Sequence, residues 1–91
     1  MAQVVVTLKI MPKSPEVDFT PIEAEVRQRI QEFSGIVARV EQEPVAFGLK
    51  ALKILFTMDE DKGSTENLEN GIAGIAGVNS VMVTDVRRTM G

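Results

Sequence analysis

The side chains that most often carry out chemistry are missing from this chain. Its 91 residues include no cysteine and no histidine. Thiolate chemistry, disulfides, the Ser/His/Asp triad and metal sites built from these ligands are therefore excluded. The spacing of the lysines and carboxylates does not point to catalysis either. We expect no metal ion and no cofactor.

An acid-rich stretch, DEDKGSTENLE at residues 59–69, is the nearest approach to an ion-binding motif. It resembles a calcium loop only loosely, because Asp59, Asp61 and Gly63 do not fall at the offsets that such a loop requires. We interpret the stretch as a solvated turn that leads into a helix, where the helix dipole favours acidic side chains.

The glycine run GIAGIAG, residues 71–77, does not have the form of a phosphate-binding loop. Such loops join a strand to a helix, whereas these glycines are spaced three apart inside a predicted helix. We interpret Gly71 and Gly74 as small residues that let the helix approach a sheet closely, and Gly77 as the residue that ends the helix.

Two local features remain as candidate contact sites. The first is Phe47-Gly48 in the segment EPVAFGLKAL, between two strand patterns, with Pro44 before it and Lys50 after it. From periodicity alone, an aromatic residue at this place is more often tucked under a turn as part of the core. The alternative is an exposed anchor for a protein partner, since aromatic anchors dominate interface energetics.

The second feature is the segment TDVRR, in which Asp85, Arg87 and Arg88 end the last predicted strand. A solvated, charged strand end is the ordinary interpretation. Whether these residues lie near Phe47 depends on strand register, which the sequence leaves open.

Composition argues against nucleic-acid and membrane partners. The chain carries ten basic and thirteen acidic residues, a net charge of −3, whereas nucleic-acid binding normally needs a basic face. The chain has no apolar run approaching the length of about 18 residues that a membrane-spanning helix needs. An acidic protein can still favour a basic protein partner through complementary fields.

The hydrophobic pattern predicts a single α+β domain over residues 1–91. Strands are predicted over residues 3–11, 36–43, 49–58 and 78–88, and helices over residues 20–33 and from Ser64 or Thr65 to Gly77. Thr20 and Glu23 match a capping box at the first helix start. In the second strand, Ile36, Ala38 and Val40 are predicted to share one face. The order β-α-β-β-α-β indicates a ferredoxin-like, four-stranded antiparallel sheet with two helices on one face.

Three blocks of the sequence together resemble a known family. The opening VVVTLKIMPKSPEVDF, the central EPVAFGLKALKI and the closing GVNSVMVTDVRRTMG are similar to archaeal translation elongation factor 1-beta, in order and over essentially the whole chain. The resemblance implies a guanine nucleotide exchange factor and not an enzyme. Its partner would be the GTPase elongation factor 1-alpha, in its GDP-bound and nucleotide-free forms. It would act in the cytoplasm, without direct contact to nucleic acid or membrane.

The resemblance also implies roles for individual residues. It assigns Phe47 to GTPase contact, against the core interpretation, and places Pro44, Gly48, Lys50 and Asp85 around the contact surface. Eukaryotic relatives use a lysine near the C-terminus beside the Mg²⁺ site of the GTPase. This chain has Gly91 or nothing there, and the nearest cations are Arg87 and Arg88.

Two other function classes remain to be compared with the exchange-factor hypothesis. A ferredoxin-like regulatory or small-ligand module would use the open sheet face or the glycine-rich second helix. RNA-recognition domains share the same plan but stack bases on exposed aromatics of the central strands. Phe56 falls on the same predicted face as Leu52 and Ile54, which makes it a core residue and disfavours RNA binding.

Overall fold

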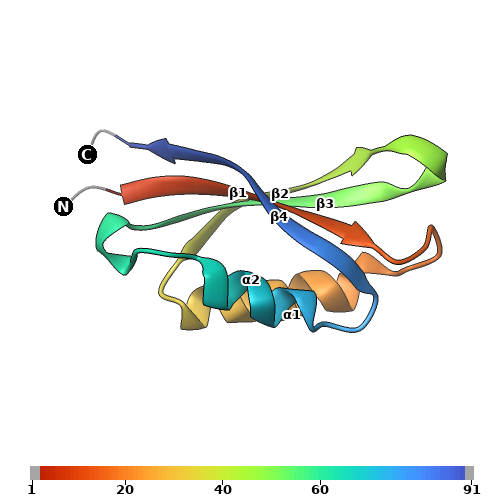
Figure 1. The fold of residues 1–91 in the computed structure, drawn as a ribbon, viewed down its shortest axis with the longest axis horizontal. Helices are drawn as coiled ribbons and strands as arrows, with labels where there is room; N and C mark the ends of the chain where they lie inside the picture. Colours follow the sequence, from red (N-terminus) through yellow and green to blue (C-terminus); the bar gives the residue numbers. More distant parts are fainter. Residues whose placement is uncertain (1–2, 90–91) are drawn as a thin grey trace.

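The computed structural model describes residues 3–89, which form a four-stranded antiparallel sheet with two α-helices on one face (Figure 1). The elements are β1 (Gln3–Pro12), α1 (Phe19–Glu32), β2 (Ile36–Pro44), η1 (Ala46–Gly48), β3 (Lys50–Asp59), η2 (Glu60–Lys62), α2 (Glu66–Ala73) and β4 (Val78–Arg88). The strand order is β2-β3-β1-β4. This arrangement confirms the predicted ferredoxin-like plan.

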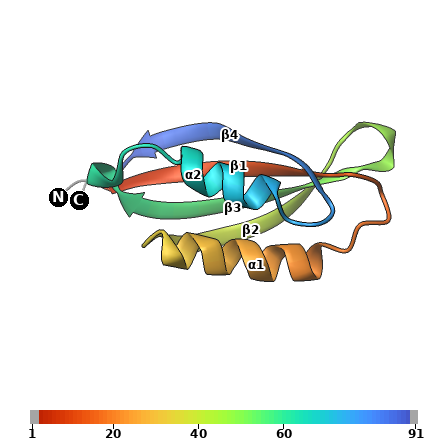
Figure 2. The same ribbon diagram turned by 60° about the horizontal axis from the view of Figure 1, so that its bottom comes forward.

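The core lies between the sheet and the helices. Alternate residues of the two central strands, β1 and β3, point toward the helices because side chains alternate between the two faces of a strand. The buried side chains of this core include Val6, Leu8, Ile10, Leu52, Ile54, Phe56, Met58, Ile22, Val26, Ile30, Leu68, Ile72 and Ile75. Helix α1 packs beside the β2 edge of the sheet and α2 toward the β4 edge (Figure 2).

The start of α1 differs from the prediction. Asp18, not Thr20, is the N-cap, and its carboxylate accepts a hydrogen bond from the backbone N–H of Thr20 at 2.9 Å. This hydrogen bond lowers the pKa of Asp18 below its ordinary value. The helix begins early because Phe19 is buried against the core, which draws the first turn inward. The predicted cap therefore lies two residues after the observed one.

The predicted face of β2 is wrong. Ile36 is 67% exposed and Ala38 is exposed as well, whereas Val37 and Val40 pack against the core. The register between β2 and β3 shifts between Val37 and Arg39. This bulge adds one residue to β2, so two valines three positions apart reach the same face.

Gly71 and Gly74 do not face the sheet, contrary to the prediction. Gly71 faces α1 instead. A Cβ atom built there would lie 2.8 Å from Nη1 of Arg29. Gly74 is exposed and forms the C-cap of α2, which ends at Ala73. Gly77 lies beyond the helix in the turn before β4, with φ of 91°, so it does not cap the helix.

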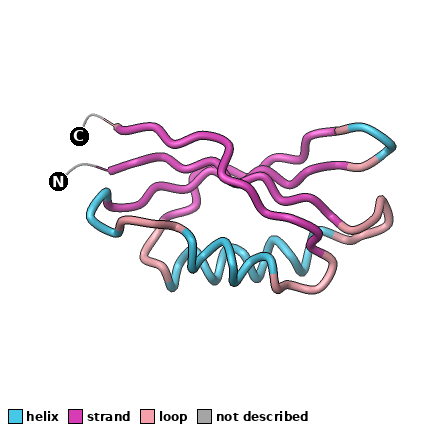
Figure 3. Tube along the Cα trace, in the orientation of Figure 1, coloured by secondary structure: helices cyan, strands magenta, loops and turns pink. Residues whose placement is uncertain are grey.

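The second face of the sheet carries no helix, and we call it the open face. The side chains of β1 and β3 that alternate with the core point there, among them Val5, Thr7, Lys9, Met11, Lys53, Leu55 and Thr57. Figure 3 shows that α1, α2 and η2 lie on the opposite side, while η1 stands apart at the tip of the β2–β3 hairpin. In the described chain, neither helix is long and apolar enough to cross a membrane.

Candidate protein-interaction site

The connection between β2 and β3 is a tight turn that projects from one end of the sheet (Figure 1). The backbone N–H of Val45 donates to the carbonyl of Leu49 at 2.9 Å, and the N–H of Leu49 donates to the carbonyl of Ala46 at 3.3 Å. These two bonds close the loop around Phe47 and Gly48. The turn therefore has a defined shape although little packs against it.

Phe47 stands at the tip of this turn and is 94% exposed. Its backbone has φ of 65° and ψ of 28°, in the left-handed region that residues other than glycine rarely adopt. A large apolar side chain in a strained backbone without core contacts contributes little to folding. The interpretation from periodicity, a core residue, is thus wrong. The exposure that the family resemblance requires is confirmed.

The other predicted residues of the central block lie close to Phe47 in the chain. Pro44 ends β2, Lys50 begins β3, and both are exposed. Gly48 also has positive φ, 73°, and a Cβ atom there would meet nothing within 4 Å. We call Pro44, Phe47, Gly48 and Lys50 the hairpin cluster. A hollow beside it is lined by Pro12, Ser14, Pro15, Val17, Asp18, Phe19, Gln42, Gly48 and Lys50.

Asp85, Arg87 and Arg88, which we call the C-terminal cluster, lie at the other end of the sheet. Arg87 pairs with Val5 of β1, and Arg88 pairs with Val4. Val5, the partner of Arg87, lies five residues before Ile10 on β1, and Ile10 pairs with Leu52 of β3. Leu52 lies two residues after Lys50, so seven residue steps along the strands separate the level of Arg87 from the level of Lys50. At about 3.4 Å per residue, the two levels are roughly 24 Å apart. The structure therefore does not bring the two predicted features together.

The two arginines of the C-terminal cluster point to different faces and have different partners. Arg87 lies on the open face, and its Nε donates to Asp85 at 2.8 Å. Arg88 lies on the helix side, where Nε and Nη2 each donate to a carboxylate oxygen of Glu60 at 2.6 Å. This bidentate contact lowers the pKa of Glu60 and raises that of Arg88.

Glu60 is a residue that the sequence analysis missed. It lies 28 positions before Arg88 and follows directly after β3. Only the pairing of β1 with both β3 and β4 brings their ends together. No local pattern signals such a contact. Gly91, where the resemblance would place the C-terminal lysine of eukaryotic relatives if this chain has a matching position, lies outside the described residues.

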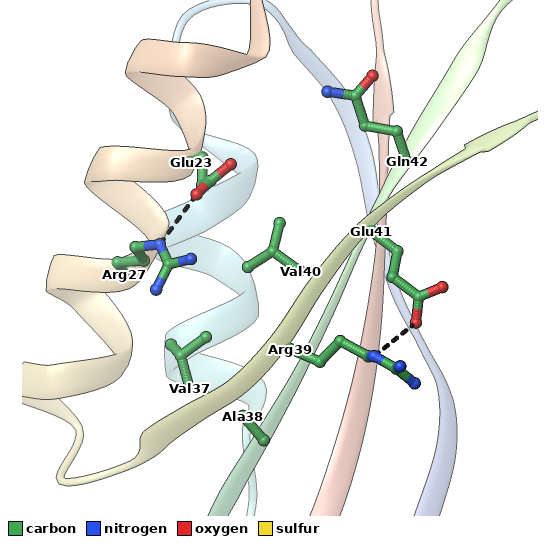
Figure 4. Close-up of a pocket in the computed structure, with 8 residues that line it drawn as sticks. All are labelled: Glu23, Arg27, Val37, Ala38, Arg39, Val40, Glu41 and Gln42. Carbon is green, nitrogen blue, oxygen red and sulfur yellow. Dashed lines mark hydrogen bonds and ion pairs between the residues drawn. The ribbon is translucent and has the colours of Figure 1, made fainter.

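A second concave surface is a groove between α1 and β2 (Figure 4). Eight residues line it: Glu23, Arg27, Val37, Ala38, Arg39, Val40, Glu41 and Gln42. Its four charged side chains are already paired, Arg27 with Glu23 at 3.0 Å and Arg39 with Glu41 at 3.4 Å. The groove therefore offers no unpaired charge to a ligand. Within residues 3–89, no cluster of acidic side chains is placed to hold a metal ion.

Comparison with known proteins identifies the family. A family model described as the EF-1 guanine nucleotide exchange domain matches residues 5–89. The chain belongs to this family. Elongation factor 1-beta of Methanothermobacter thermautotrophicus is 42% identical over 90 residues, which cover 99% of this chain and all of that protein. Elongation factor 1-beta of Methanobrevibacter smithii is 43% identical with the same coverage.

Two solved structures that align with this EF-1 exchange domain share little of its sequence. The C-terminal domain of the MgtC protein from Mycobacterium tuberculosis aligns with a TM-score of 0.65 at 17% identity, covering 96% of this chain and 87% of that one. The ACT domain of GTP pyrophosphokinase from Chlorobium tepidum aligns with a TM-score of 0.59 at 12% identity, covering 89% and 97%. These likenesses concern the fold alone.

Proposed function

We propose that this chain promotes exchange of GDP for GTP on elongation factor 1-alpha through protein–protein contact alone, with Phe47 as its main anchor. The single observation that carries the proposal is the Phe47 ring, 94% exposed on a closed turn with a left-handed backbone. Membership of the EF-1 guanine nucleotide exchange domain family supports the reaction. Residues 1–91 act as a single exchange domain.

The exposed ring can supply substantial binding energy. Covering a phenylalanine side chain removes it from water and is worth about 1.5–3 kcal/mol. The closed turn lowers the entropy lost on binding, because the loop is already fixed before the partner arrives. Such anchors typically dominate the affinity of an interface. Pro44, Gly48 and Lys50 then shape the surface around the anchor.

Exchange needs no bond chemistry in the exchange factor. A protein that binds the nucleotide-free GTPase more tightly than the GDP-bound form weakens GDP binding by the same factor. The chain therefore binds the GDP-bound form first and is held most tightly once GDP has left. The C-terminal cluster makes a second contact through Arg87, whose side chain is 80% exposed on the open face although its Nε contacts Asp85. Neither nucleic acid nor a membrane takes part, and the site of action is the cytoplasm, where translation takes place.

A fluorescent-nucleotide experiment tests this proposal. Elongation factor 1-alpha is loaded with fluorescent GDP, and nucleotide release is followed after adding excess unlabelled GDP with and without this chain. We expect a much faster release with the wild-type chain and a strong loss of this effect with Phe47→Ala. An unchanged release rate with the wild-type chain would refute the proposed function.

A matched control removes exposed apolar surface elsewhere. Ile36 is 67% exposed and begins β2, at the end of that strand away from the hairpin cluster. The C-terminal cluster lies on β4, at the opposite edge of the sheet. Ile36→Ala should therefore exchange like the wild type. Equal losses from Phe47→Ala and Ile36→Ala would mean that Phe47 has no special role as anchor.

A further inference from the structure

Two lysines stand directly opposite one another at the centre of the open face. Lys9 of β1 pairs with Lys53 of β3, and both strands are internal to the sheet. Residues directly opposite in an antiparallel pair have Cβ atoms about 4.5–5.5 Å apart, and like charges at such positions destabilise the fold. Glu43 offsets this repulsion at Lys53 but not at Lys9, so the pair concentrates positive charge on one face of a chain with a net charge of −3.

The two lysines differ in their counter-ions. Nζ of Lys53 lies 3.2 Å from a carboxylate oxygen of Glu43. Lys9 takes part in no ion pair within residues 3–89, although it is half-buried. Its neighbour on the β4 side is Met82, which has no charge. The unpaired cations Lys13, Lys50 and Lys62 are all exposed, so Lys9 is the half-buried cation that lacks a counter-charge in the described chain.

The position of the lysine pair relates it to the proposed interface. Along the strands, Lys9 and Lys53 lie between the level of Lys50 and the level of Arg87. The helices cover the other face of the sheet (Figure 1). A partner that touches both the hairpin cluster and Arg87 therefore passes over the open face and covers Lys9.

We propose that Lys9, with Lys53 beside it, is a docking point for a carboxylate on the surface of the GTPase. A carboxylate placed over the pair supplies the counter-charge that Lys9 lacks and relieves the repulsion between the lysines. Half-burial of Lys9 strengthens the contact, because an ion pair shielded from water is screened less. This inference rests on the proposed function and adds to it the chemical nature of a second contact.

Charge reversal tests the inference. In Lys9→Glu, the new carboxylate faces Lys53 and repels the carboxylate of the GTPase. We expect binding to nucleotide-free elongation factor 1-alpha to weaken at least tenfold at low salt, with a smaller difference at high salt. Urea unfolding of the free variant should show stability equal to or above that of the wild type. A structural role for Lys9 would instead lower the stability.

Lys62→Glu is the matched control, because it makes the same change in net charge at an exposed position in η2. It should change the dissociation constant less than threefold. If Lys9→Glu binds as tightly as Lys62→Glu while the wild type still speeds GDP release, the inference is overturned and the proposed function stands. If Lys9→Glu loses affinity for transfer RNA but not for the GTPase, the pair serves nucleic acid and the inference is likewise overturned.

Discussion

Replacing Phe47 with asparagine separates the contribution of the aromatic ring to folding from its contribution to binding. Phe47 has φ of 65° and ψ of 28°. Holding an L-residue in this region costs about 1–2 kcal/mol, and asparagine enters it several times more often than most residues. The substitution therefore relieves strain in the free protein and removes the proposed anchor at the same time.

The expected gain in stability follows from the exposure of the ring. A fully covered phenylalanine buries about 200 Å², and with Phe47 94% exposed the turn covers only about a twentieth of that area. At about 25 cal/mol per Å², the lost contact is worth roughly 0.3 kcal/mol. Relief of about 1 kcal/mol of strain exceeds this loss. We expect Phe47→Asn to be more stable by about 0.5–1 kcal/mol, and its Tm to rise by roughly 2–8 °C.

The measurements are urea unfolding of the free proteins and GDP release from elongation factor 1-alpha at limiting concentrations of this chain. Loss of an anchor worth at least about 2 kcal/mol should lower exchange roughly 30-fold. Phe47→Ala is the control, since it removes the ring and keeps the strained residue, so it should lose exchange without the gain in stability. An asparagine variant less stable than the wild type by more than about 1 kcal/mol would contradict this reasoning, and so would one that exchanges normally.

Two further predictions concern stability. The hydrogen bond from Arg88 lowers the pKa of Glu60 below its ordinary value of 4.5, so ionised Glu60 stabilises the folded protein. This stabilisation is complete at pH values above the pKa of Glu60 in the unfolded chain. It is lost as the pH falls through the pKa of Glu60 in the folded protein. In Glu60→Gln, the unfolding free energy should depend less on pH in this acidic range, and an unchanged pH profile would show that the pair does not contribute. A Cβ atom at Gly35 would lie 2.9 Å from Cγ2 of Ile30 and 3.0 Å from the ring of Phe56. Gly35→Ala should therefore destabilise the protein by about 1–3 kcal/mol in urea unfolding, with normal exchange by the folded fraction; an unchanged urea midpoint would mean that the core adapts around the methyl group.

The fold was largely predictable because its central strands follow a simple period. Leu52, Ile54, Phe56 and Met58 alternate without interruption, and all four are buried. Errors arose where one residue breaks the period. The bulge near Ala38 is invisible in the sequence, since the segment IVARV matches both possible faces equally well. The first helix start was misplaced because Asp18 and Thr20 are both good caps, and burial of Phe19 decides between them.

The candidate site was less predictable than the fold. Periodicity gave the wrong environment for Phe47, because burial depends on whether another segment covers the turn and not on the residue itself. The resemblance to the family predicted that Phe47 is exposed, whereas the local pattern did not. The ion pair of Arg88 with Glu60 and the opposition of Lys9 and Lys53 both depend on strand register, which sequence-local signals do not encode.

The register of β1 has a consequence for how this protein evolves. β1 is hydrogen-bonded along its length to both β3 and β4. The distance from the hairpin tip to Arg87 is therefore set by the number of residues in these paired strands. Core side chains can be exchanged for others of similar size without altering this span. A two-residue insertion in one of these strand pairs would lengthen it by about 6.8 Å. The sheet therefore sets the distance between the two proposed contact clusters, and a change in strand length would alter that distance.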